Sequence, residues 1–254
     1  MRKYGKILTT DLNSTSKEKV LAFVRDSLAR GYKFWISTPN SEIILQAEKD
    51  FGLHKALQNS DLAIPDTIGV GLAARFLGLG EINIIKGREL FMEIIKLASK
   101  KGWKVFLLGG GPDIAKVAGL NLRKSFKKVR IAYNEGPRLN AAGEPVSQTD
   151  VGLEKKAIAE INEFAPQILF VAFGAPKQEK WVMRNLKRLN IGGAMVVGGT
   201  LDYVAGKAPL PPKGLEKSFE WLWRLVTQPA RAPRIIRATI VFPWRVFLSK
   251  WNKA

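Results

Sequence analysis

Two hydrophobic patterns alternate along this chain. Short runs rich in β-branched and aromatic residues are followed by longer stretches in which apolar residues recur every three or four positions. The first pattern is typical of buried strands and the second of amphipathic helices. Their alternation predicts βαβ units, and therefore an α/β, Rossmann-like fold with a mostly parallel sheet flanked by helices. The expected strands lie at residues 33–37, 61–64, 103–108, 129–133, 168–173 and 194–197.

Helical stretches fill most of the gaps between these strands. The first helix is expected to begin with a capping box, because Thr15 and Glu18 have the required spacing ahead of an apolar stripe that ends at Gly31. The other expected helices lie at residues 41–50, 51–57, 88–101, 113–126, 151–164 and 177–189.

The pattern changes at Gly206. The proline-rich segment 206–214 cannot continue a helix or a central strand. Beyond it, residues 215–227 are amphipathic, and Pro229, Pro233 and Pro243 are expected to divide the remainder into short helices. We therefore predict an α/β core at 1–205, a linker at 206–214 and a basic, tryptophan-rich helical appendage at 215–254.

Charge separates the end of the chain from the rest. The protein has 41 Lys and Arg against 22 Asp and Glu, which gives a formal net charge of +19 at pH 7. Residues 221–254 contain seven of the basic residues, four tryptophans and no acidic residue. Cations favour phosphate, and tryptophan favours either a membrane interface or a stacked base. Composition thus predicts an anionic partner and leaves a membrane and a nucleic acid both open.

Composition also excludes several kinds of chemistry. Without cysteine, disulfides, thiolate nucleophiles and Cys-containing zinc sites are impossible. His54 is the only histidine, and the D-x-D, G-x-S-x-G and G-x-G-x-x-G patterns are absent, so we expect no metal, no catalytic triad and no nicotinamide or other cofactor. No signal peptide and no apolar run of about 18 residues is visible. These features are compatible with a cytoplasmic location, and they predict that any contact with a membrane is at its surface.

Candidate site residues follow the predicted strands, because ligands of parallel sheets bind beyond the carboxyl ends of the strands. Asp66 follows one strand, where a carboxylate can act as a general base or simply cap the next helix. Thr38 and Asn40 follow another strand and offer a hydroxyl and an amide to a sugar or phosphate, although Asn40 is also placed to cap a helix.

Two further loops carry candidate ligand contacts. Residues 109–113 read Gly-Gly-Gly-Pro-Asp and open a helix, whose free N–H groups and dipole favour phosphate. Gly109 and Gly110 are therefore candidate phosphate contacts, with a plain tight turn as the alternative. In the next such loop, Lys177 and Gln178 are placed to touch a ligand, while Glu179 is placed to interact favourably with the helix dipole.

Six segments together carry a resemblance to a known family. They are Thr-Pro-Asn at 38–40, Ile-Pro-Asp at 64–66, and the stretches 105–112, 173–181, 198–206 and 219–234. In this order and spacing, the chain resembles the WecG/TagA/CpsF glycosyltransferases of bacterial cell-surface polysaccharide synthesis over roughly residues 33–237.

The resemblance implies an inverting, metal-independent enzyme. Such an enzyme would move a sugar, for example N-acetylmannosamine, its uronic acid or glucose, from a UDP donor onto a polyprenyl-diphosphate-linked sugar at the inner face of the cytoplasmic membrane. By position, Asp66 would deprotonate the acceptor hydroxyl, and Thr38 and Asn40 would line the donor-sugar pocket. Gln178 would hydrogen-bond substrate. The residues that would close over the site and stabilise the departing UDP are Arg224, Arg231 and Arg234.

The chain departs from the family pattern at two places. Thr67 stands where the family usually has glycine after the Pro-Asp pair, which predicts a narrower loop or a changed sugar preference. A basic residue often precedes the glycine that aligns with Gly87, and here Lys86 precedes it and Arg88 follows it.

The appendage is then expected to serve two purposes. Its arginines would face the diphosphate, and a second group would face lipid headgroups: Trp244, Arg245, Phe247, Lys250 and Trp251. The expected partners are a UDP-sugar, a lipid-linked acceptor and an anionic membrane, with no nucleic acid. The alternative is a nucleic-acid-binding protein that uses the basic aromatic tail, and it predicts binding that weakens steeply with salt.

Overall fold

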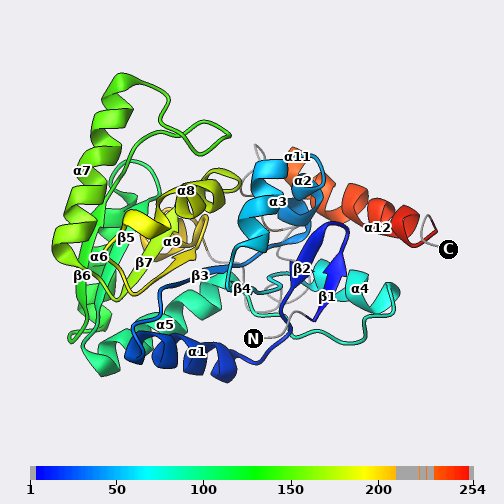
Figure 1. Cartoon of the computed structure of the whole chain (residues 1–254), viewed down its shortest axis with the longest axis horizontal. Helices are drawn as coiled ribbons and strands as arrows, with labels where there is room; N and C mark the ends of the chain where they lie inside the picture. The colour runs from blue at the N-terminus through cyan, green and yellow to red at the C-terminus, as the bar shows by residue number, and fades with distance from the viewer. Residues whose placement is uncertain (1–3, 210–222, 224–226, 228–231, 252–254) are drawn as a thin grey trace.

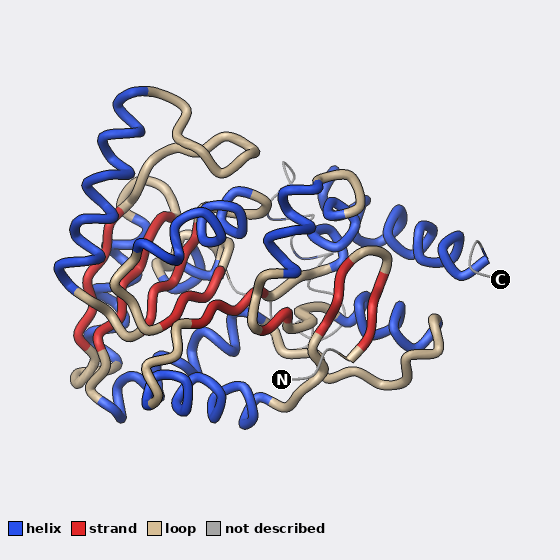
Figure 2. The backbone as a smooth tube through the Cα atoms, in the orientation of Figure 1, coloured by secondary structure: helices blue, strands red, loops and turns tan. Residues whose placement is uncertain are grey.

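A computed structural model describes residues 4–209, 223, 227 and 232–251 of the chain (Figure 1). In this described part, six parallel strands form one sheet in the order β4-β3-β8-β7-β5-β6 (Figure 2). The strands are β3 (Phe34–Ser37), β4 (Leu62–Ala63), β5 (Lys104–Gly109), β6 (Arg130–Asn134), β7 (Ile168–Ala172) and β8 (Gly193–Val196). All six predicted strands and the α/β, Rossmann-like class are confirmed.

Alternation of side chains along the strands divides the core between the two faces of the sheet. On β5, for example, Val105 and Leu107 belong to one cluster, while Phe106 and Leu108 belong to the other. The helices α1 (Lys17–Ala29), α5 (Gly87–Lys101), α6 (Ile114–Ser125) and α9 (Thr200–Val204) cover the first face. The helices α3 (Phe51–Gln58), α7 (Gln148–Phe164) and α8 (Lys177–Asn185) cover the second, and the 3-10 turn η1 (Leu186–Arg188) follows α8.

A third apolar cluster lies beyond the β4 edge of the sheet. It joins the antiparallel hairpin β1 (Gly5–Ile7) and β2 (Thr10–Leu12) to α2 (Ser41–Ala47) and α4 (Ile68–Phe76). The C-terminal helix contributes Phe242 and Val246, both buried there. Residues at opposite ends of the chain therefore share one core (Figure 1).

The C-terminal segment is helical where it is described. It runs through α11 (Ala232–Ile236), the π-helical turn η3 (Arg237–Val241) and α12 (Phe242–Trp251). Most of the predicted linker and the first part of the predicted appendage lie outside the described residues, so the boundaries at 206–214 and 215–254 stay predictions.

The helices predicted between Thr15 and Leu189 all exist, with shifted ends. The division expected at Pro233 and Pro243 was wrong, because helical structure runs without a break from Ala232 to Trp251. The first helix is capped by Ser16, whose Oγ accepts a hydrogen bond from the backbone N–H of Lys19, so the expected cap at Thr15 was wrong by one residue. Thr15 is buried instead. The hairpin β1–β2 and the helices α4 and α9 were not predicted.

Candidate active site

The connections after two neighbouring strands run in opposite directions, and this indicates where a crevice is expected at the carboxyl edge of the sheet. The connection after β5 runs outward to β6, whereas the connection after the neighbouring β7 runs the other way to β8. In open α/β sheets, ligands bind in a crevice at such a reversal, so we expect the binding crevice at the carboxyl ends of these strands. The loops after β3, β4, β5, β7 and β8 all lie along this edge, because the strands are parallel.

Asp66 and Thr38 come together with the start of α5. The Asp66 carboxylate accepts a hydrogen bond from the backbone N–H of Gly87, the first residue of α5, over 2.6 Å. A side chain at Gly87 would place its Cβ 2.9 Å from the Thr38 hydroxyl, so glycine permits this close approach. The partial positive charge of a helix N-terminus favours a carboxylate at such a position.

Asn40 and Thr67 begin the two helices beside Asp66. Asn40 caps α2, because its Oδ1 accepts from the N–H of Ile43 over 3.0 Å. Thr67 occupies the N-cap of α4, and its hydroxyl lies 3.4 Å from that of Ser41. The Thr67 hydroxyl therefore connects α4 to the start of α2. A contact of Asn40 with a donor sugar stays a prediction.

Gln178 connects two loops of the crevice. Its Oε1 accepts from the backbone N–H of Gly174, after β7, and from that of Gly198, after β8, over 3.2 and 3.1 Å. Its Nε2 donates to Glu179 over 3.0 Å, and the side chain is buried. Gln178 thus fixes the relative position of the two loops, whereas its predicted contact with substrate stays untested.

The glycine-rich turn after β5 is a tight turn that also presents a helix N-terminus. Gly109 and Gly110 have positive φ angles, and a Cβ on Gly110 would lie 2.5 Å from the side chain of Ile114. The backbone N–H of Asp113 donates to the Glu135 carboxylate over 2.8 Å, so a negative group lies at the start of α6. Phosphate contact at Gly109 and Gly110 stays a prediction.

Lys207 lies in the predicted linker, and the structure shows that it brings a cation to this turn. Its Nζ donates to the carbonyl oxygen of Pro112 over 3.2 Å, and the residue is exposed. Sequence spacing carried no signal for this contact, because 95 residues separate the two positions.

Glu179 is a buried carboxyl group beside the crevice. Its side chain is 1% exposed, and its Oε2 has no hydrogen-bond partner among the described residues. Burial raises the pKa of Glu179 from 4.5 to about 7, against the opposing effects of the Gln178 hydrogen bond and the charges of Arg234 and Lys180. The group therefore changes charge near neutral pH.

Glu179 gives a prediction for stability against pH. Because its pKa is raised by folding, the folded state holds this proton more tightly than the unfolded chain. The resulting stabilisation is present below about pH 4.5 and is lost as the pH rises through about 7. Glu179→Gln removes this titration. The free energy of unfolding of the variant minus that of wild type should therefore rise by up to about 3 kcal/mol between pH 4.5 and 8.

Urea unfolding at several pH values measures this difference. Glu163→Gln, at an exposed position of α7, is the matched control and should leave the pH dependence unchanged. A constant difference between Glu179→Gln and wild type over this range would contradict the raised pKa.

Arg234 is the predicted tail arginine that falls within the described residues. From α11, its Nε lies 2.8 and 3.0 Å from the two carboxylate oxygens of Glu42, in the first turn of α2. It also lies near enough to Glu179 to lower the pKa of that carboxyl. The C-terminal segment thus reaches the helix that Asn40 caps. Arg224 and Arg231 lie outside the described residues.

The residues predicted to meet lipid lie on α12. Trp244, Phe247 and Trp251 are exposed. Arg245 forms an ion pair with Glu48 over 3.0 Å, and Lys250 donates to the carbonyl oxygen of Phe76 over 2.7 Å. The two cations therefore also hold α12 against the rest of the protein.

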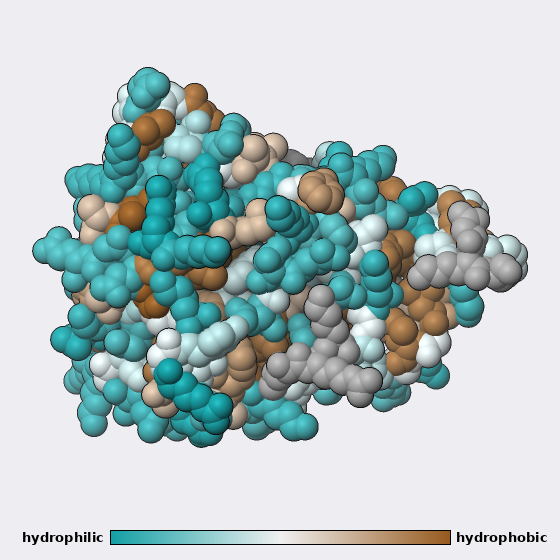
Figure 3. All heavy atoms as spheres, viewed as in Figure 1, coloured by the Kyte–Doolittle hydropathy of each residue, from teal (hydrophilic) through white to brown (hydrophobic). Residues whose placement is uncertain are grey.

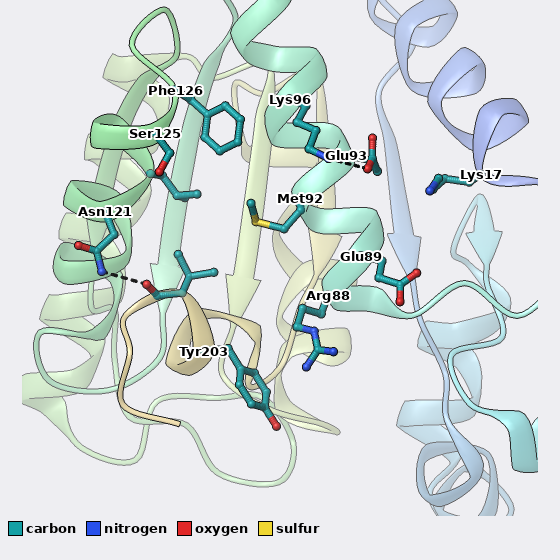
Figure 4. Close-up of a pocket in the computed structure, with 12 residues that line it drawn as sticks. Lys17, Arg88, Glu89, Met92, Glu93, Lys96, Asn121, Ser125, Phe126 and Tyr203 are labelled. Atoms are coloured by element: carbon teal, nitrogen blue, oxygen red, sulfur yellow. Dashed lines mark hydrogen bonds and ion pairs between the residues drawn. The ribbon is translucent and has the colours of Figure 1, made fainter. Parts of the chain in front are cut away.

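A surface pocket of about 570 Å³ lies between α5, α6 and α9 (Figure 4). At one end, the Arg88 guanidinium faces the Tyr203 ring, 5.2 Å from its centroid. The lining contains none of the predicted catalytic or substrate-binding residues: Lys17, Arg88, Glu89, Met92, Glu93, Lys96, Asn121, Leu122, Ser125, Phe126, Tyr203 and Val204. The Arg88 side chain therefore lies toward Tyr203 in this pocket.

The described residues contain neither a metal-binding cluster nor a membrane-spanning helix. Within 4–209 and the described C-terminal positions, no group of three or more His, Cys, Asp or Glu side chains could hold a metal ion. Over the same residues, each helix is too short or too polar to cross a bilayer.

Comparison with known proteins identifies relatives along almost the entire chain. The family model described as "Glycosyl transferase WecG/TagA/CpsF family" matches residues 5–254. A protein of Bacillus subtilis (strain 168) is 31% identical over 207 residues, which cover 79% of this chain and 74% of the relative. Proteins of Staphylococcus aureus strains NCTC 8325 and COL are 25% identical over 248 residues, covering 96% of this chain and 92% of each relative. All three are named N-acetylglucosaminyldiphosphoundecaprenol N-acetyl-beta-D-mannosaminyltransferase.

Proposed function

The chain belongs to the WecG/TagA/CpsF family of glycosyltransferases and is a hexosyltransferase, and from this premise we propose its reaction. It transfers N-acetylmannosamine or a related hexose from a UDP-sugar onto a sugar carried by a polyprenyl diphosphate. The names of the relatives support both the transferred sugar and the lipid-linked acceptor. The residues of this chain support the chemistry of the step.

The observation that carries the mechanism is the setting of Asp66. Its carboxylate lies at the carboxyl edge of the sheet, next to Thr38, and is oriented by the 2.6 Å hydrogen bond from Gly87. A fixed carboxylate at this edge is placed to accept the proton of an acceptor hydroxyl. The freed oxygen attacks the anomeric carbon as the bond to UDP breaks, and one displacement inverts the configuration there.

The departing UDP requires positive charge in place of a metal ion. At the start of α6, the diphosphate would replace the Glu135 carboxylate that accepts from the N–H of Asp113, and Lys207 adds an ammonium group there. Arg234 is held by Glu42 and lies near enough to the buried Glu179 carboxyl to act on it through its charge. We propose that these groups, together with Arg224 and Arg231, stabilise the diphosphate, and that Thr38 and Asn40 bind the sugar.

Lys207→Ala is expected to weaken donor binding. Removing one exposed cation from a diphosphate site should raise the KM for the UDP-sugar by about 3- to 10-fold, because a charge-assisted contact is worth about 1 kcal/mol in an exposed setting. Initial rates at varied UDP-sugar measure the change. Lys155→Ala, on an exposed face of α7, is the matched control. An unchanged KM in Lys207→Ala would remove this residue from the donor site.

We propose that the enzyme works at the inner surface of the cytoplasmic membrane, with Trp244, Phe247, Lys250 and Trp251 toward lipid. A lipid-linked acceptor has to be met there, and tryptophan beside cations suits the headgroup region. The nucleic-acid alternative has less support, because the matching family and the named relatives are glycosyltransferases.

The proposed reaction is tested by a transfer assay. The full chain is supplied with a short-chain lipid diphosphate carrying N-acetylglucosamine and with each of several UDP-sugars, and extension of the acceptor is followed by mass spectrometry. We expect one added hexose, with UDP-N-acetylmannosamine the preferred donor. No extension with any donor would contradict the proposal.

A further inference from the structure

Helix α4 has an apolar face that the rest of the protein leaves exposed. Its inner face packs Val70, Ala73 and Ala74 into the cluster shared with α12. Its outer face carries Ile68, Leu72 and Phe76 at intervals of four residues, and all three are exposed, Leu72 by 63%. A surface helix of a soluble protein normally presents polar residues outward. An apolar stripe on the outer face therefore indicates a covering partner.

The stripe on α4 continues onto α12. The ring of Phe76 stacks on that of Phe247 with centroids 6.1 Å apart, and Phe247 lies 5.7 Å from Trp244 and 5.0 Å from Trp251. Lys250 places its ammonium group 4.5 Å from the centroid of the Phe76 ring. Figure 3 shows a group of apolar residues at the end of the molecule where Figure 1 places α4 and α12.

We propose that α4 and α12 form one lipid-docking face, made of Ile68, Leu72, Phe76, Trp244, Phe247 and Trp251, which lies on an anionic bilayer surface. Two of its six residues are tryptophans, which favour the boundary between water and lipid. The same two helices carry exposed cations, Arg75 on α4 and Lys250 on α12, which attract anionic headgroups. A net charge of +19 opposes pairing of two copies through this face and favours a negatively charged partner.

The lipid-docking face places the bilayer next to the proposed base. Helix α4 begins at its N-cap Thr67, directly after Asp66. A helix held at the headgroup level therefore holds Asp66 close to that level, where a sugar linked to lipid through a diphosphate would lie. This consequence rests on the proposed function, whereas docking itself does not.

Vesicle binding tests the role of α4 without any sugar transfer. Full-length wild type, Leu72→Gln and Leu153→Gln are titrated with vesicles of phosphatidylcholine alone and with 30% phosphatidylglycerol added, a composition of roughly natural surface charge. Leu153 is the matched control, because it is an exposed leucine on α7 at the opposite end of the molecule (Figure 1). Thermal unfolding confirms that each variant is folded.

We expect wild type and Leu153→Gln to bind the anionic vesicles equally, and Leu72→Gln to bind about fivefold more weakly, because a half-inserted leucine contributes part of its transfer free energy. Equal binding by Leu72→Gln and wild type would overturn the inference, as would wild type that binds neither vesicle. A Leu72→Gln variant that loses self-association in sedimentation but keeps vesicle binding would assign the face to a second copy instead. If no variant transfers sugar while the vesicle pattern holds, the proposed function fails and the lipid-docking face stands.

Discussion

Asp66→Asn is expected to lower kcat by about 10²- to 10⁴-fold, the range that general-base catalysis supplies. The amide keeps an oxygen that can accept the N–H of Gly87, so the turn before α5 should be preserved. The amide nitrogen cannot take a proton from the acceptor hydroxyl. The loss should therefore appear in kcat, with little change in the KM for the UDP-sugar.

Initial rates with a soluble short-chain acceptor measure this effect, and thermal unfolding checks the fold. Asp26→Asn changes an exposed carboxylate of α1 and should behave like wild type. Wild-type kcat in Asp66→Asn would exclude this carboxylate as the base. A parallel loss of folding would require Asp66→Glu as a second variant, which keeps a carboxylate and should retain more activity than Asp66→Asn.

Arg234→Ala is expected to lower kcat by about 10- to 100-fold. The guanidinium is held by Glu42 at the start of α2, and its charge reaches the crevice strongly enough to act on Glu179. Loss of one preorganised cation at a departing diphosphate costs roughly 1.5 to 3 kcal/mol in the transition state. Glu42 would also lose its partner, so a smaller loss of stability should accompany the change.

Separate values of kcat and KM for both substrates show whether Arg234 acts in catalysis or only holds the C-terminal segment in place. Arg237→Ala, one turn further along in η3, is the matched control because its side chain is exposed. A decrease confined to stability, with kcat equal to that of Arg237→Ala, would mean that Arg234 only holds the C-terminal segment in place.

The parallel sheet could be predicted because its signal is local. Each strand is a short run whose alternate residues enter opposite apolar clusters, as in Ile168 to Ala172. The loop that follows each strand is marked by glycine, proline or a small polar residue. The convergence of Thr38 with Asp66 followed from the same reasoning, since parallel strands end at one edge.

The hairpin and α4 escaped prediction for local reasons. Strands β1 and β2 have three residues each, too few to show a period. Helix α4 contains Gly69 and Gly71, which lower helix propensity, and its outward residues are apolar, so no amphipathic pattern marks it. The apolar outer face that hid the helix is also the feature that the lipid-docking face explains.

The position of the site in the fold could be predicted from the sequence. The contacts that its residues make could be predicted only in part. Glu179 is acidic near a helix N-terminus, a place that usually faces water, and only tertiary packing buries it. Gln178 uses its Oε1 on two backbone groups, one of them 20 residues away. Lys207 reaches the glycine-rich turn from a distant segment. Each of these contacts joins residues that no spacing rule relates.

The stereochemistry of the transferred sugar tests the central claim most directly. The claim is a single displacement in which a hydroxyl activated by Asp66 attacks the anomeric carbon and protein cations stabilise the departing UDP. The product made from α-linked UDP-N-acetylmannosamine in the presence of EDTA is isolated, and its anomeric one-bond carbon–proton coupling is measured by NMR. We predict a β-linked product formed at an undiminished rate in EDTA. An α-linked product, or transfer that EDTA abolishes and a divalent cation restores, would contradict the account.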